Sequence, residues 1–72
     1  MAQREVQFAV TLKDGEWTVF KDGVALESGM SRSAAIVRAE ALAFAAESNG
    51  AAVELVIQDY TGELKQRRSG KA

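Results

Sequence analysis

Residues 31–50 read SRSAAIVRAEALAFAAESNG, and this stretch decides the fold. Alanine, leucine, arginine and glutamate dominate it, and all four are good helix formers. Ser31 is the predicted N-cap, because its hydroxyl can accept a hydrogen bond from a free amide in the first turn. Asn49 and Gly50 are predicted to end the helix, since glycine suits the left-handed position just past a helix C-terminus. We therefore expect a helix from Arg32 to about Asn49.

The predicted helix carries two apolar stripes. One has the spacing of a face that covers a sheet, and its small alanines allow the helix to sit close to the strands. The other lies on the opposite side, where a surface helix of a monomer is expected to be polar. The first stripe consists of Ala35, Ile36, Ala39, Leu42, Ala43 and Ala46, and the second of Val37, Ala41 and Phe44.

The second stripe has two interpretations. As an interface, it would bury Phe44, whose exposure forgoes roughly 1.5–3 kcal/mol, a large fraction of the stability of so small a chain. A homodimer through helices paired about a two-fold axis is the simplest form of such an interface. Alternatively, the stripe is merely exposed, because isolated apolar side chains are normal on soluble proteins. Alanine is also common on exposed helix faces because it is a strong helix former, so Ala41 is no evidence of burial.

Strand patterns flank the helix on both sides. Residues 5–13 alternate between apolar and polar side chains, as a half-buried strand does. Asp-Gly pairs at residues 14–15 and 22–23 favour tight turns, and Gly29 is predicted to end a short, weak third strand. The predicted strands are residues 5–13, 16–21, 24–28, 53–59 and 63–69.

Together these elements predict a single small α+β domain over residues 1–72. Its antiparallel sheet consists of two hairpin units, in the order strand, strand, weak strand, helix, strand, strand, with the helix packed on one face. The C-terminal tail is expected to be frayed from about residue 70. The predicted core is Val6, Phe8, Val10, Trp17, Val19, Ile36, Ala39, Leu42, Ala43, Leu55 and Ile57.

The composition excludes several kinds of chemistry. The 72 residues contain no cysteine, histidine or proline, so neither a disulfide nor a Cys/His zinc site is possible. Asp14, Asp22 and Asp59 lie in predicted turns, and no general base is placed for nucleophilic catalysis. We therefore expect no enzyme activity, no cofactor and no metal. With no targeting or membrane-spanning segment in sight, a cytoplasmic location is the default expectation.

Nucleic-acid binding is the alternative function. Trp17, Phe20 and Tyr60 are aromatic residues on which bases could stack. Against this, ten acidic and nine basic residues leave a net charge of -1, which argues against a chain built for phosphate backbones. The basic residues of the last strand and tail are Lys65, Arg67, Arg68 and Lys71.

The order of the motifs matches a known pattern. They are GEWTV at 15–19, Ser31 opening a helix with Ala35-Ile36, Ala39 and Leu42-Ala43, VELVI at 53–57, and Asp59 and Gly62 before a basic strand. Over roughly residues 6–69 the chain resembles the bacterial family called domain of unknown function 2188. The resemblance implies a fold and no activity, because the family has none assigned. Phe44 departs from the family pattern, where an acidic or polar residue is expected.

The sequence thus predicts a non-catalytic protein-interaction module of unknown biological role. It is expected to be a homodimer through Val37, Ala41 and Phe44, or to bind another protein there, with an exposed sheet edge as a second candidate surface. The alternative is a small nucleic-acid-binding protein that uses the basic C-terminal strand. A small inhibitor or accessory protein of a mobile element also fits the size of the chain.

Overall fold

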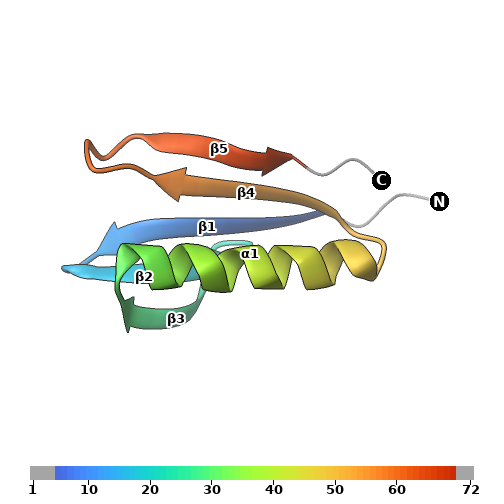
Figure 1. Cartoon of the computed structure of the whole chain (residues 1–72), viewed down its shortest axis with the longest axis horizontal. Coiled ribbons are helices and arrows are strands. Elements are labelled where there is room, and N and C mark those ends of the chain that lie inside the picture. The colour runs from blue at the N-terminus through green and yellow to red at the C-terminus, as the bar shows by residue number, and fades with distance from the viewer. Residues whose placement is uncertain (1–4, 70–72) are drawn as a thin grey trace.

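The computed structural model describes residues 5–69, which form a five-stranded sheet with one helix across one of its faces (Figure 1). This architecture confirms the predicted α+β class and the predicted order of elements. The tail predicted to be frayed from about residue 70 lies outside the described residues. The elements are β1 (Glu5–Lys13), β2 (Glu16–Lys21), β3 (Val24–Met30), α1 (Arg32–Ser48), β4 (Ala52–Gln58) and β5 (Leu64–Ser69).

The sheet is mixed, with strand order β3-β2-β1-β4-β5. Strands β1 and β4 pair in parallel, with Val6 opposite Val53 and Val10 opposite Ile57, and the other neighbouring pairs are antiparallel. The sequence predicted an antiparallel sheet throughout, so the parallel pairing of β1 with β4 corrects that prediction. The physical reason is the path of α1, which carries the chain back across the sheet to the free edge of β1. Strand β4 then runs in the same direction as β1, and the two strands with the most apolar inner faces lie side by side near the centre.

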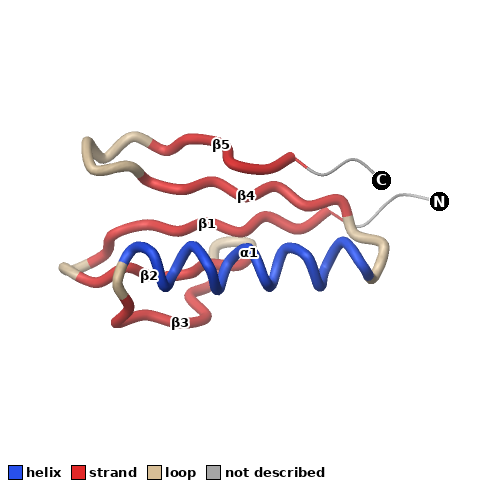
Figure 2. The backbone as a smooth tube through the Cα atoms, in the orientation of Figure 1, coloured by secondary structure: helices blue, strands red, loops and turns tan. Residues whose placement is uncertain are grey.

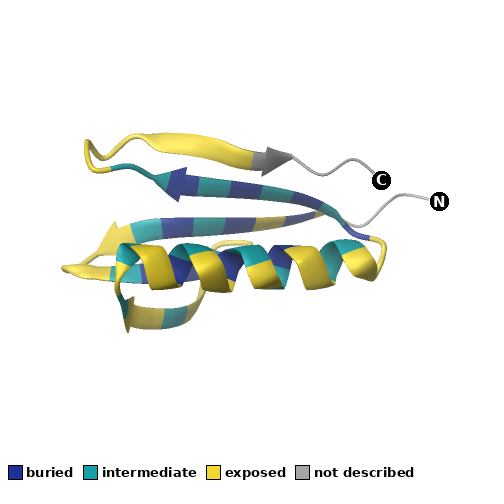
Figure 3. Ribbon diagram, viewed as in Figure 1, coloured by how far each residue is buried: buried dark blue, intermediate teal, exposed yellow. Residues whose placement is uncertain are grey.

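The core lies between α1 and the sheet, and the inner face of the helix contributes only alanines to it. Ala35, Ala39 and Ala43 are each 0% exposed, and they form the narrow buried band of α1 in Figure 3. Because this band is one residue wide, the bulkier Ile36 and Leu42 lie at its borders and are only partly buried. The remaining buried apolar residues are Val6, Phe8, Val10, Val19, Ala51, Val53, Leu55 and Ile57.

The core differs from the predicted one in both directions. Three residues predicted to be buried are only partly buried, namely Trp17, Ile36 and Leu42, and four others are buried that the prediction did not include, namely Thr18, Ala35, Ala51 and Val53. Trp17 is partly buried and packs against the core from its border, where its partner across the strands is Met30. Thr18, on the opposite face of the same strand, is 2% exposed, and its hydroxyl donates to the carbonyl of Glu16 at 3.3 Å. The buried hydroxyl therefore keeps a partner, as buried polar groups must.

The predicted ends of the helix are confirmed. The Ser31 hydroxyl accepts a hydrogen bond from the Ala34 amide at 3.2 Å, with the backbone of Ser31 extended as an N-cap requires. At the other end Asn49 is the C-cap, and Gly50 follows with a φ of 88° in the left-handed region.

Both edge strands contain bulges. The prediction that Gly29 ends the third strand is wrong, because β3 continues to Met30 through an irregularity in its register. Gly29 adopts a φ of 78°, which glycine tolerates and which lets the strand carry an extra residue. In β5 the register shifts between Gln66 and Arg68, so Arg67 is the extra residue there. Bulged edges are poor templates for pairing with further strands, so the sheet edges are weaker candidate surfaces than the helix.

Candidate protein-interaction surface

The outer face of α1 carries the three residues predicted as an interface, and we call Val37, Ala41 and Phe44 the outer stripe. Val37 is 68% exposed and Phe44 66%, and Ala41 is also exposed. Figure 3 shows the exposed band along the side of α1 that faces away from the sheet. No part of the chain between residues 5 and 69 buries these side chains, so the outer stripe is apolar surface open to a partner.

The charged residues beside the outer stripe are directed to the flanks of the helix. Arg38 Nε donates to Glu27 Oε2 of β3 at 2.9 Å. On the other flank, Arg67 Nε of β5 donates to Glu40 Oε2 at 2.9 Å. The bulge in β5 helps to direct Arg67 toward the helix, which is a common effect of bulges. Each ion pair bridges the helix to an edge strand, and the outer stripe between them stays uncharged.

A groove adjoins the outer stripe on the side of β3. Helix α1 packs chiefly over β4, β1 and β2 and makes little contact with β3, which lies clear of the helix at the edge of the sheet (Figure 2). The resulting open hollow of about 650 Å³ has an apolar floor, with Glu27 and Arg38 at its rim. We call it the β3 groove; Met30, Ala34, Val37 and Ala41 provide its apolar lining.

The same side of the molecule continues as apolar surface toward the C-terminal end of the helix. A second hollow of about 300 Å³ lies there, lined by Leu26 of β3 and by Leu42 and Ala45 of α1, among others. Leu26 is 45% exposed and Val24 64% exposed. The β3 side of α1 is therefore largely apolar. Sequence reasoning missed this surface, because the register of the bulged strand decides which residues of β3 face the helix.

The basic residues of the alternative function are paired where the structure describes them. Lys65 Nζ lies 3.5 Å from Asp59 Oδ2 and 3.9 Å from Glu63 Oε1. Arg67 is bound to Glu40. The side chain of Arg68 and the whole of Lys71 lie outside the described residues. The two cations that the structure does place are both offset by carboxylates, so they form no strongly positive patch.

The carboxylate of Asp59 organises the turn between β4 and β5. Its Oδ1 accepts hydrogen bonds from the Thr61 hydroxyl at 2.6 Å, the Thr61 amide at 2.9 Å and the Glu63 amide at 3.0 Å. The hydroxyl of Thr61, followed by these amides and Lys65, lowers the pKa of Asp59 to about 2. The aspartate thus acts as a turn residue, which is the role that the sequence predicted for it.

Trp17 and Tyr60, two of the three aromatic residues on which bases were predicted to stack, both lie close to the guanidinium of Arg32. The Arg32 guanidinium lies 5.7 Å from the centre of the Trp17 ring and 4.8 Å from that of Tyr60. Its Nε also donates to the Gln58 carbonyl at 3.2 Å, which ties the start of α1 to the end of β4. Tyr60 stays 83% exposed on its outer face. Nothing in the sequence predicted this arrangement, because it depends on how the start of α1 packs against β2 and the turn after β4.

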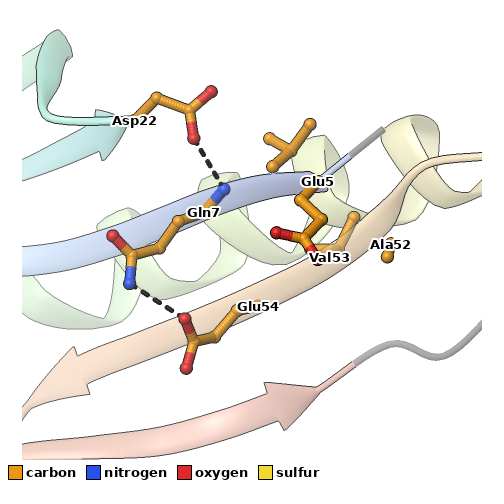
Figure 4. A pocket seen from close by; sticks show the side chains of 7 residues that line it. Glu5, Gln7, Asp22, Ala52, Val53 and Glu54 are labelled. Carbon is orange, nitrogen blue, oxygen red and sulfur yellow. Dashed lines mark hydrogen bonds between the residues drawn. The ribbon is translucent and has the colours of Figure 1, made fainter. Parts of the chain in front are cut away.

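A further hollow of about 370 Å³ lies over the start of β1 and β4 and contains three carboxylates (Figure 4). Two of them already have partners: Asp22 Oδ1 accepts from the Gln7 amide and Glu54 Oε1 from Gln7 Nε2, each at 2.9 Å. Glu54 Oε2 also accepts from Gln66 Nε2 at 2.9 Å. Within residues 5–69, no group of three acidic, histidine or cysteine side chains is arranged to hold a metal ion.

The geometry defines a small α+β protein whose most distinctive surface is the apolar outer side of its helix. In the part of the chain that the structure describes, no helix has the length and apolar character needed to cross a membrane. Comparison with protein-family models, curated proteins and solved structures finds no match. The resemblance to domain of unknown function 2188 therefore stays a prediction.

Proposed function

We propose that this chain is a non-catalytic protein-interaction module of the cytoplasm and that it forms a homodimer through the outer stripe. One observation carries the proposal: Val37 and Phe44 are 68% and 66% exposed on a face from which the charged side chains are directed away. Scattered apolar residues are common on protein surfaces, but an uncharged apolar row flanked by ion pairs resembles the centre and rim of an interface.

The free energy gained by burying Phe44 supports the same conclusion. Burying the exposed two-thirds of a phenylalanine side chain is worth on the order of 1–2 kcal/mol. A two-fold dimer buries the ring twice, once from each copy. For a chain of this size, whose own stability is only a few kcal/mol, such a contribution is substantial. Self-association would therefore stabilise the fold as well as cover the stripe.

The test is the molar mass of the protein in dilute solution, before and after the change Phe44→Glu. We expect sedimentation equilibrium to give a dimer for the wild type and a monomer for the variant. Circular dichroism should be unchanged, because Phe44 is outside the core.

Leu64→Glu is the matched control. Leu64 is 55% exposed, and its pairing with Gln58 places it on the sheet face opposite α1. This variant should remain a dimer. A wild type that sediments as a monomer at tens of micromolar, or a Phe44→Glu variant that still dimerises, would contradict the proposal.

A further inference from the structure

We propose that in this dimer the two helices run antiparallel and the Phe44 ring of each copy packs into the β3 groove of the other. The inference rests on the proposed function, and it adds the site that receives the ring. Four features support it: the area available, the chemistry of the two flanks, the spacing along the helix, and the charge at the rim of the groove.

The outer stripe is too small to form a stable interface alone. A phenylalanine side chain contributes 150–250 Å² when fully buried, so Phe44, at 66% exposed, offers on the order of 130 Å². Val37 is a smaller side chain at a similar exposure, and Ala41 adds less still. A standard interface takes about 800 Å² from each partner. The interface must therefore spread to one flank of the helix.

The two flanks differ in chemistry, and only one of them suits burial. On the β5 side the stripe is bordered by the Glu40–Arg67 ion pair, and the hollow beyond it is lined mainly by charged and polar residues, which are costly to bury. On the β3 side are the apolar lining of the β3 groove and the exposed side chains of Leu26 and Val24. We infer that the interface extends over β3.

The spacing along the helix makes this face complementary to itself. Phe44 is seven residues after Val37, which lines the β3 groove, and seven residues correspond to about 10 Å along a helix. If two helices cross antiparallel with the two-fold axis beside Ala41, Phe44 of each copy lies level with Val37 of the other. The small side chain of Ala41 allows a close approach at the crossing point. The two-fold axis of an antiparallel helix pair places the same flank of both helices on the same side of the interface. The β3 groove of each copy therefore faces the other copy.

The charges at the rim of the groove do not oppose this arrangement. Arg38 and Glu27 are joined by a hydrogen-bonded ion pair at 2.9 Å and remain 48% and 39% exposed. Two copies that meet along this flank therefore bring together neutral pairs rather than like charges. The occupant that fits the apolar floor and the neutral rim is a second copy of this chain.

A charge exchange between copies tests the contact. Ala34 lines the groove, and Ala34→Glu places a carboxylate there. Glutamate is a good helix former and an acidic side chain is favourable in the first turn, so the helix should be retained. Phe44→Lys places a cation at the position of the ring. Each variant alone should be a monomer, and their equimolar mixture should form a heterodimer at least tenfold tighter than either self-association.

A mixture of Ala34→Glu with Phe44→Glu is the matched control, because it differs only in the sign of one charge. It should stay monomeric by sedimentation and by native mass spectrometry. If the wild type is a monomer, both this inference and the proposed function fail. If Phe44→Lys is a monomer while Ala34→Glu still dimerises, or if the opposite charges do not pair, the groove contact is refuted, and the proposed dimer must extend from the outer stripe over a different part of the surface.

Discussion

The buried alanine band of α1 makes a sharp prediction about packing. Ala39 is 0% exposed and lies in the same core cluster as Val10 and Leu55, which are also 0% exposed. Ala39→Leu adds three carbon atoms. With free space beneath the helix, those atoms would stabilise the fold by about 2.4 kcal/mol, at roughly 0.8 kcal/mol for each carbon. If there is no free space beneath the helix, the added atoms overpack the core and lower the free energy of unfolding by about 1–3 kcal/mol. Since the helix touches the sheet through alanines, we expect the second outcome.

The assay is urea denaturation followed by circular dichroism, at one fixed protein concentration because the proposed self-association would add to the apparent stability. A loss of about 1–3 kcal/mol is a large part of the few kcal/mol expected for the whole chain. Ala45→Leu is the control, because Ala45 is exposed on the same helix and leucine and alanine have similar helix propensities. Since Ala45 lines the hollow on the β3 side, both changes are also compared in the Phe44→Glu background, where the proposed dimer is absent. An Ala39→Leu protein as stable as the wild type, or more stable, would refute the close approach of helix and sheet.

Three further predictions concern the cap, the turn and the basic strand. Ser31→Ala should lower the free energy of unfolding by about 1 kcal/mol, because the Ala34 amide loses its acceptor, whereas Ser33→Ala should change it little; equal effects in urea denaturation would contradict the assigned cap. The lowered pKa of Asp59, about 2, means that its ionised form stabilises the fold fully above about pH 4 and that this contribution is lost as the pH falls toward 2. The stability difference between the wild type and Asp59→Asn should therefore shrink from pH 5 to pH 2, and a constant difference would argue against the turn hydrogen bonds. Because Lys65 and Arg67 are paired, the wild type should pass a single-stranded DNA or RNA column near physiological salt without retention. Salt-sensitive retention, abolished when Lys65, Arg67, Arg68 and Lys71 are all changed to glutamine, would instead favour the nucleic-acid alternative.

The local elements of this fold could be predicted because local physics determines them. Alternating burial of Val6, Phe8 and Val10 along β1 follows from the two-residue period of a strand. The ends of α1 follow from the hydroxyl of Ser31 and from the ability of Gly50 to adopt a positive φ, and both residue types can be recognised in the sequence. The exposure of Val37 and Phe44 likewise follows from the 3.6-residue period of the helix.

The features that escaped prediction depend on long-range pairing. Parallel pairing of β1 with β4 is set by the path of the helix over the sheet, and nothing within either strand encodes its direction. The bulge at Gly29 arises from the register between β2 and β3, and the sequence alone shows only a glycine. The same holds for the β3 groove and for the partner of Arg38, since both depend on where β3 lies relative to α1. These are also the features that shape the candidate surface.

The residue types of the outer stripe conflict with local physics in a way that favours an interface. Positions 37 and 44 lie outside the core, so lysine or glutamate there would leave the packing of the chain unchanged. Either would also be a better helix former than valine or phenylalanine, by a few tenths of a kcal/mol. Val37 and Phe44 are therefore unfavourable both for contact with water and for helix formation. Residues that conflict with local preferences in this way concentrate at functional sites. The proposed interface would resolve the conflict, because burial in a second copy would stabilise those two residue types and penalise the charged ones.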